Sequence, residues 1–249
     1  MENYRKYPNN FLNEVIYRIE YPYISKLGNI DTESANEFKD SISNEFPHYQ
    51  VNTAKKIRIN IDPSTGNNAD RIERESLVWN YSNYDNTKKV ELSSKAMTLI
   101  YTKDAYSTFE SFLKDIELLL NSLMIYQVSE VEFMGLRYIN QITLGEYENI
   151  QDCINSKFHV NYTQFEGNIT QALNMIELKI REYYLKIQYG LFNPIYPTVN
   201  SKKDFILDFD CYLKNEEFTN IEHYLKEMHS IIYNEFEESI ENKLRKEME

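Results

Sequence analysis

Hydrophobic residues along this chain recur with two different periods, and that alternation constrains the fold more than any other feature. Several segments alternate apolar and polar residues, as half-buried strands do: residues 14–21, 56–61, 77–81, 90–101, 130–142, 176–191 and 205–213. Residues 106–126 and 220–246 instead place apolar side chains three or four positions apart, as on one side of a helix. The pattern predicts an α+β fold, an antiparallel sheet with long amphipathic helices packed on one face.

Local signals refine the expected helices. A short amphipathic helix is expected within residues 31–46, ahead of Pro47. Ser107 with Glu110, and Thr219 with Glu222, have the spacing of capping boxes at the starts of the two long helices. The last helix is expected to be continuous and therefore about 40 Å long.

In outline, the chain reads as two similar halves. Residues 1–144 contain strands, a long helix and the central Gly135–Asn140 segment, and residues 145–249 contain strands and end in the second long helix. The residues themselves show no repeat, so two domains and one continuous domain both stay open.

Charge and cysteine content limit the function and the compartment. Lys and Arg total 27 against 39 Asp and Glu, a formal net charge of −12. This balance argues against broad, non-specific nucleic-acid binding, which draws its energy from Lys and Arg contacts to phosphates. The two cysteines, Cys153 and Cys211, are expected to be reduced thiols. The chain shows neither a secretory leader nor an apolar run of about 18 residues, so a cytoplasmic protein outside the membrane is expected.

Recognisable catalytic signatures do not occur in the sequence. It holds no phosphate-binding glycine loop, no GxSxG and no HExxH, and its four histidines make a histidine-rich metal site a poor expectation. No cofactor is expected. The 21 tyrosines could stack on bases, although sheet propensity explains them equally well.

Asp208 and Asp210 form the best carboxylate pair in the sequence. Two residues apart on a strand, they point to one face, with Asp204 further along it. Carboxylate pairs of this kind hold Mg²⁺ in many enzymes acting on nucleic acids. We expect a solvated polar face opposite the apolar residues of the same strand, with a metal site as the alternative.

Three further residues are candidates for ligand binding: Arg137, Asn140 and His229. Arg137 and Asn140 lie on opposite faces of their strand. Arg137 is expected either in an ion pair, for instance with Glu14 or Glu20, or in an anion site. His229 is expected to be a packed histidine bonded to a carbonyl, with a general base as the alternative.

Three segments together resemble a known family. They are the opening Tyr7–Pro8 with the strand after it, the central motif G-L-R-Y-I-N at Gly135–Asn140, and the ending Met228–Glu237, which fits L/M-H-x-x-I-x-x-x-F-E. The chain is similar in these respects to a sporadically distributed, uncharacterised bacterial and archaeal family of about the same length. The resemblance implies one fold over the whole chain and no mechanism, and the family's patchy occurrence suggests defence-associated genes.

These observations favour a non-enzymatic binding or interaction protein, an accessory component of a bacterial defence or regulatory system. Its partner is expected to be a protein, which the sequence does not identify. Homo-oligomerisation also stays open. The alternative is a metal-dependent enzyme that acts on nucleic acid or nucleotide through Asp208 and Asp210.

Overall fold

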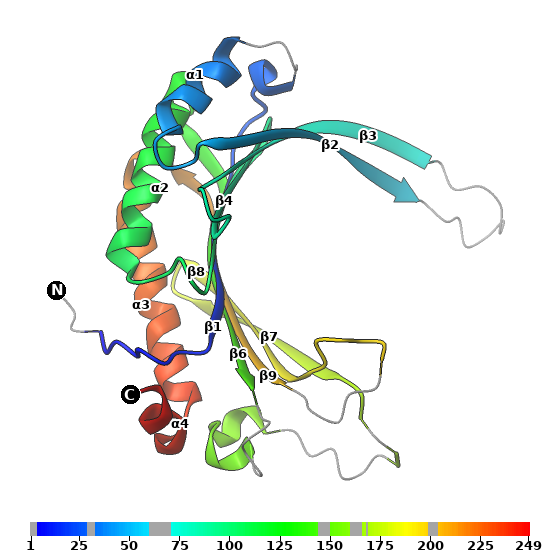
Figure 1. Cartoon of the computed structure of the whole chain (residues 1–249), viewed down its shortest axis with the longest axis vertical. Helices are drawn as coiled ribbons and strands as arrows, with labels where there is room; N and C mark the ends of the chain where they lie inside the picture. The colour runs from blue at the N-terminus through cyan, green and yellow to red at the C-terminus, as the bar shows by residue number, and fades with distance from the viewer. Residues whose placement is uncertain are drawn as a thin grey trace. The chain divides into compact units, whose positions relative to one another are not determined.

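The structure is a computed structural model that describes residues 4–28, 33–59, 71–143, 150–159, 166–167, 169–198 and 204–249. Its strands are β1 Leu12–Glu20, β2 His48–Ile59, β3 Arg71–Ser82, β4 Lys88–Ser93, β5 Ala96–Thr102, β6 Glu130–Thr143, β7 Ala172–Ile180, β8 Tyr183–Phe192 and β9 Asp204–Glu217 (Figure 1). Its α-helices are α1 Glu33–Ile42, α2 Phe109–Leu123, α3 Ile221–Ser239 and α4 Asn242–Met248. Short 3₁₀ helices occur at η1 Ser25–Gly28, η2 Met124–Tyr126, η4 Ile150–Asp152, η5 Ser156–Phe158 and η6 Phe218–Asn220.

The strands form one antiparallel sheet, which confirms the α+β class. Their order is β2-β3-β4-β5-β1-β6-β9-β8-β7. The chain divides into two compact units, both built from separated segments. Unit 1 comprises Met1–Tyr17, Met134–Lys214 and Thr219–Glu249, and unit 2 comprises Arg18–Phe133 and Asn215–Phe218. The division after residue 144 and the similarity of two halves stay predictions, and the loop expected at 62–68 lies outside the described residues.

Unit 2 packs α2 against the strands β4 and β5. The apolar stripe of α2 is buried, and Phe112 meets the ring of Tyr101 edge to face with 4.8 Å between centroids. Lys88 adds an ion pair of 2.8 Å to Asp115 of the helix. The helix begins one residue later than the sequence suggested, because the hydroxyl of Thr108, and not that of Ser107, accepts the capping hydrogen bond from Ser111 N.

The segment 90–101, expected as one strand, is a hairpin of β4 and β5. Ser94 and Lys95 form the turn, and the Ser93 hydroxyl accepts a hydrogen bond of 3.1 Å from Ala96 N. The large apolar residues that are fully buried change phase across this turn, from Val90 and Leu92 on the first strand to Met97, Leu99 and Tyr101 on the second. This phase change was the available sequence signal.

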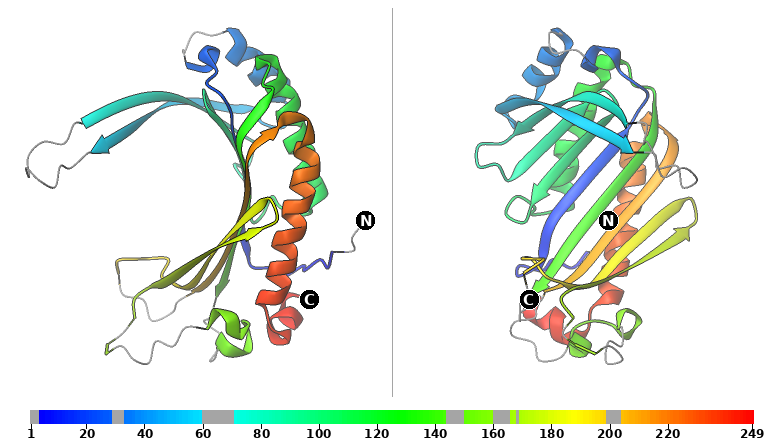
Figure 2. Two further views of the ribbon diagram at one scale, coloured as in Figure 1. Left: turned by 180° about the vertical axis from the view of Figure 1, so that it is seen from behind. Right: turned by 90° about the vertical axis from the view of Figure 1, so that its right-hand side faces the viewer.

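Unit 1 contains a hairpin within the alternating segment 176–191. β7 and β8 pair from Ala172↔Leu191 to Ile180↔Tyr183, and Arg181 in the turn has a φ of 55°. β8 then pairs with β9 so that Ile187 lies opposite Phe209. Phe209 contacts Phe236 of α3. In the right-hand view of Figure 2, β8 and β9 lie in front of α3. The odd-numbered residues of β9 therefore face the helix.

The C-terminal helix is broken, contrary to the expectation of one continuous helix over 220–246. Ile240 has extended backbone angles (φ −113°, ψ 146°) between α3 and α4, and it forms a bridge with Ile154. Asn155 N donates to the Ser239 carbonyl and Glu241 N donates to the Cys153 carbonyl. These bonds satisfy backbone groups that the break leaves without helical partners. The expected capping box at Thr219 is also absent, because Asn220 is the N-cap and makes no side-chain capping bond.

No helix among the described residues is long and apolar enough to cross a membrane.

Burial of the α3 stripe predicts a large stability effect at Leu225, which is fully buried. Leu225→Ala should lower the free energy of unfolding by about 2–5 kcal/mol, because it removes packed methyl groups and leaves a cavity. Guanidinium-induced unfolding followed by circular dichroism measures the change. The matched control is Glu222→Ala, on an exposed position of the same helix, which should cost less than about 1 kcal/mol. Equal midpoints for the two variants would contradict the packing of α3.

Candidate functional site

Two residues singled out from the sequence for different reasons, Arg137 and Asp208, bind each other. The Arg137 guanidinium donates from Nε to Asp208 Oδ1 at 2.8 Å and from Nη2 to Oδ2 at 2.6 Å. β6 and β9 are neighbours in the sheet, which brings the two side chains onto the same face. Arg137 therefore has its main partner at Asp208 and not at Glu14 or Glu20, although Glu14 adds a weaker electrostatic attraction.

The pair is asymmetric in exposure. The Asp208 side chain is 7% exposed and the Arg137 side chain 39%. The hydrogen bonds to Asp208 raise the pKa of Arg137, so the guanidinium stays charged. A buried carboxylate that already accepts two charged hydrogen bonds has less capacity to bind a metal ion.

Asp210 has a different environment from Asp208. Burial raises the pKa of the Asp210 carboxyl, and the attraction of Arg137 and Lys186 opposes this only in part. Asp204 accepts a hydrogen bond from Gln141 and so is also engaged. Within the described part of the chain, no group of three or more His, Cys, Asp or Glu side chains is placed to hold a metal ion.

Asn140 lies on the opposite face of the sheet from Arg137, because the two residues are an odd number of positions apart in β6. His229 of α3 lies on the same side as Asn140. Asn140 Nδ2 donates to the Leu207 carbonyl at 3.1 Å and is buried. His229 Nδ1 lies 3.2 Å from the Tyr138 hydroxyl, and the ring of Tyr4 packs on it edge to face. A backbone carbonyl was expected as the partner of His229, and the structure shows the Tyr138 hydroxyl in that role. Both residues join elements of unit 1, and Arg137 is not brought together with them.

Unit 2 carries a row of polar side chains that the sequence analysis missed. Gln50, Asn80, Glu91 and Thr98 lie opposite one another on β2, β3, β4 and β5, and Arg18 of β1 donates to Thr98 Oγ1 at 3.0 Å. We call these five residues the polar strip. They lie on the face of the strands away from α2, because the alternate positions pack on the helix. The signal in the sequence was a polar residue between apolar ones in every one of these strands.

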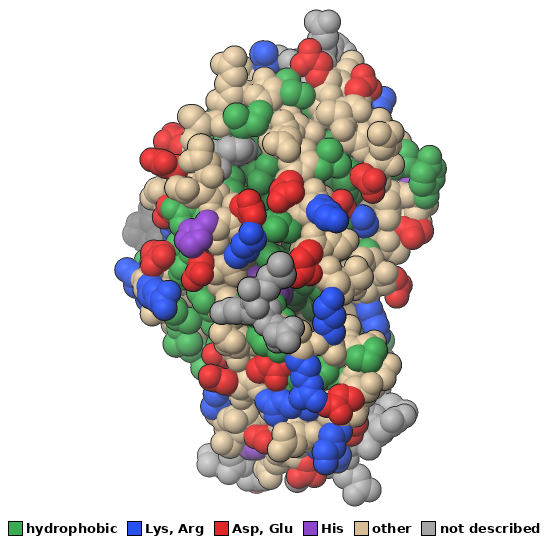
Figure 3. All heavy atoms as spheres, turned by 90° about the vertical axis from the view of Figure 1, so that its left-hand side faces the viewer, with side chains coloured by type: hydrophobic (Ala, Val, Ile, Leu, Met, Phe, Trp, Pro, Cys, Tyr) green, Lys and Arg blue, Asp and Glu red, His purple; other side chains and the backbone are tan. Residues whose placement is uncertain are grey.

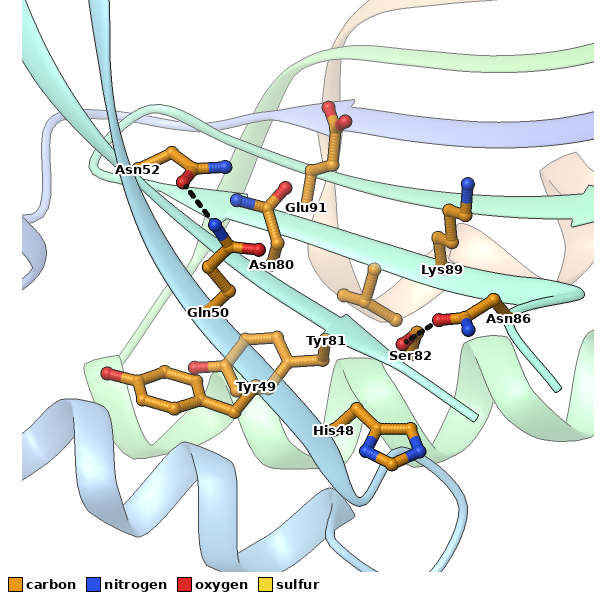
Figure 4. Close-up of a pocket in the computed structure, with 11 residues that line it drawn as sticks. His48, Tyr49, Gln50, Asn52, Asn80, Tyr81, Ser82, Asn86, Lys89 and Glu91 are labelled. Atoms are coloured by element: carbon orange, nitrogen blue, oxygen red, sulfur yellow. Dashed lines mark hydrogen bonds between the residues drawn. The ribbon is translucent and has the colours of Figure 1, made fainter. Parts of the chain in front are cut away.

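A hollow of about 330 Å³ lies at the end of the polar strip, between β2, β3 and β4 (Figure 4). Gln50, Asn80 and Glu91 line it together with further polar side chains: His48, Asn52, Ser82, Asn86 and Lys89. Tyr49, Tyr81 and Val90 complete the lining.

The Tyr81 side chain points away from the hollow, toward Phe38 of α1, and its hydroxyl is buried without a hydrogen-bond partner among the described residues.

On the face viewed in Figure 3, the Lys and Arg side chains of the described residues are interspersed with Asp and Glu. Sequence-independent binding to nucleic acid needs clustered cations.

Comparison with protein-family models and with curated proteins gives no match to this chain. The resemblance carried by Gly135–Asn140 and Met228–Glu237 therefore stays an expectation.

The buried Asp208 predicts a stability role for Arg137. Arg137→Ala should lower the free energy of unfolding by about 3 kcal/mol, the low end for breaking a buried pair, because the guanidinium is partly exposed. Chemical denaturation measures the loss. Lys226→Ala is the control, since Lys226 and its partner Glu222 are 56% and 57% exposed and such a pair is worth about 0–1 kcal/mol. Similar losses for both variants would show that burial of Asp208 does not decide the effect.

The raised pKa of Asp210 predicts that Asp210→Asn stabilises the protein at pH 7. A carboxyl whose pKa is higher in the folded than in the unfolded state stabilises the fold when protonated. That contribution is present below the ordinary value of about 4 and is lost as the pH rises through the folded-state value. The melting temperature of Asp210→Asn should therefore exceed that of the wild type at pH 7, and the two should converge below pH 4.

The same melts, repeated with Mn²⁺, test the metal-binding alternative. We expect no metal-dependent rise in the melting temperature, because both oxygens of the Asp208 carboxylate accept hydrogen bonds from Arg137. A rise of several degrees in the wild type that disappears in Asp208→Asn with Asp210→Asn would instead support a metal site, since a ligand that binds only the folded state stabilises it.

Proposed function

We propose that this chain is a non-enzymatic binding protein and that a protein partner docks on the polar strip of unit 2. The observation that carries the proposal is the register of Gln50, Asn80 and Glu91, one from each of three neighbouring strands. The row continues into Thr98 of β5, which is buried and bonded to Arg18. Such a row presents donors and acceptors at the strand spacing of about 4.8 Å, which suits a surface that meets several groups of a partner at once.

The chemistry of the strip favours a polypeptide over a small apolar ligand. Gln50 and Asn80 carry amides, each with two donors and an acceptor, and peptide groups offer the complementary set. Small-molecule sites of about 300–1,000 Å³ are lined mainly by apolar side chains. The hollow beside the strip has a volume in that range but a largely polar lining.

The proposal includes the sequence-based expectation that the long helices cover one face of the sheet and leave the other available. In unit 2, Phe112 and Asp115 of α2 contact Tyr101 and Lys88, while Asn80 and Glu91 are on the other face. In unit 1, Phe236 of α3 contacts Phe209, while Asp208 and Arg137 are on the other face.

The biological setting is proposed from the resemblance alone: an accessory role in a bacterial defence or regulatory system, in the cytoplasm. The alternative, a metal-dependent enzyme acting on nucleic acid or nucleotide through Asp208 and Asp210, has less support. The bidentate bond from Arg137 engages the carboxylate that this enzyme would need.

Affinity capture from a lysate of the native host tests the proposal. The wild-type protein and two variants of the strip, Glu91→Arg and Gln50→Ala with Asn80→Ala, are immobilised and the retained proteins identified by mass spectrometry. We expect a protein retained by the wild type to be lost from both variants, because the changes reverse a charge and remove the amides without touching the core.

Glu222→Arg, at an exposed position of α3, is the matched control and should retain the same protein as the wild type. Thermal melts of every variant should agree within a few degrees, which excludes unfolding as the cause of a loss. Retention of the same protein by wild type, control and both strip variants would overturn the assignment of the strip as the docking surface.

A further inference from the structure

Among the described strands, β7 of unit 1 is an edge strand, and it carries several exposed apolar side chains. It stands last in the strand order, with β8 as its neighbour. Leu173, Met175, Ile176 and Leu178 are between 36% and 65% exposed. An exposed edge with apolar side chains is a template for pairing with another strand, and natural proteins usually shield such edges.

The register of the β7–β8 hairpin decides which backbone groups of β7 face outward. The turn has two residues, and Ile180 and Tyr183, which flank it, are partners. In such a hairpin the two residues that flank the turn donate a backbone hydrogen bond to each other in both directions. Along the strands, hydrogen-bonded pairs of this kind alternate with pairs that are not hydrogen-bonded. The even-numbered residues of β7 therefore bond to β8, and residues 173, 175, 177 and 179 direct their N–H and C=O groups to the free edge.

We propose that β7 pairs with β7 of a second copy of this chain, antiparallel, across a two-fold axis at Leu178. In this register Leu178 lies opposite Leu178 of the second copy. Glu177 lies opposite Lys179 of the second copy, and Lys179 opposite its Glu177. The contact is in unit 1 and is independent of the polar strip.

Charge selects this register. Glu177 and Lys179 are both outward-bonding residues, so each takes part in the new ladder and meets the opposite charge directly across it. Both side chains are also held by neighbours within the chain. Tyr212 donates to Glu177 at 2.8 Å, and the Lys179 ammonium lies 5.5 Å from the centre of the Tyr184 ring.

The other face of β7 agrees with the same register. Its even-numbered residues lie opposite apolar residues of β8, such as Leu178 opposite Leu185 and Ile176 opposite Ile187. In the paired form, Ile176 meets Ile180 of the second copy on either side of the central leucines. One face of the new ladder is thus apolar and the other carries two opposite-charge pairs.

Neighbouring registers match less well. An axis at Glu177 places two glutamates directly opposite each other, and an axis at Lys179 does the same with two lysines, which is unfavourable. An axis at Ile176 places Glu177 opposite Met175 and Lys179 opposite Leu173, so each charge faces an apolar side chain. A symmetric contact of two identical surfaces closes as a dimer and does not extend into a fibre.

Charge reversal tests the pairing by sedimentation over a concentration series. The wild type should show the mass of two chains, and Glu177→Lys and Lys179→Glu should each shift to that of one 29.8 kDa chain, because like charges then face each other. The double variant Glu177→Lys with Lys179→Glu restores opposite charges and should regain the dimer. It does not restore the contact of residue 177 with Tyr212, so recovery isolates the interaction between copies.

Cysteine cross-linking tests the axis. Leu178→Cys places two thiols on residues whose Cα atoms are about 4.5 Å apart, within disulfide range. Ile176→Cys is the matched control, since its two copies are offset by four residues, or about 13 Å. The native Cys153 and Cys211 are buried, and burial raises the pKa of Cys211 to about 12, so neither competes.

The expected result is a disulfide-linked dimer of Leu178→Cys under mild oxidation and none of Ile176→Cys. A wild-type protein that sediments as one chain throughout, single reversals that remain dimeric, a double variant that stays monomeric, or cross-linking of Ile176→Cys in place of Leu178→Cys would each overturn the proposal.

Discussion

Successive residues of a strand point to opposite faces, so a residue next to one that packs against a helix points away from that helix. On β9, Phe209 packs against α3, so Asp208 and Asp210 must face away from it. On β3, Tyr81 packs against Phe38 of α1, so Asn80 faces away. The candidate functional residues of both units follow from this single geometric rule.

The same rule explains how much of the site could be predicted. The relative faces of Arg137, Asn140 and Asp208 follow from sequence period, but Asp208, expected on a solvated face, is buried against Arg137. The partner of Arg137 does not follow, because it depends on β6 and β9 being neighbours, and 71 residues separate the two side chains. Period determines which way a side chain points, whereas strand order is a property of the whole fold.

Where a helix or strand ends at a different residue from the one predicted, the structure shows a physical cause. The turn at Ser94 and Lys95 contains neither Gly nor Pro, so its only signal was the shift of the large, fully buried apolar residues from even to odd positions. The break at Ile240 preserves the apolar stripe, since Ile240 and Leu244 are both buried. What interrupts the helix is hydrogen bonding to Cys153 and Asn155, far away in sequence. A periodic pattern therefore identified the buried side chains correctly and the backbone conformation incorrectly.

The division of the chain has a consequence for synthesis on the ribosome. Nearly all of unit 2 is one uninterrupted stretch, Arg18–Phe133, whereas unit 1 needs Met1–Tyr17, residues up to Lys214 and the final Thr219–Glu249. During N-to-C synthesis, unit 2 has almost all of its residues while α3 does not yet exist. The first half of β1 can pair with its later neighbour β6 only after residues 134–143 are made, and unit 1 is complete only when Thr219–Glu249 has left the exit tunnel. The nascent protein thus acquires its order from the middle of the sequence outward.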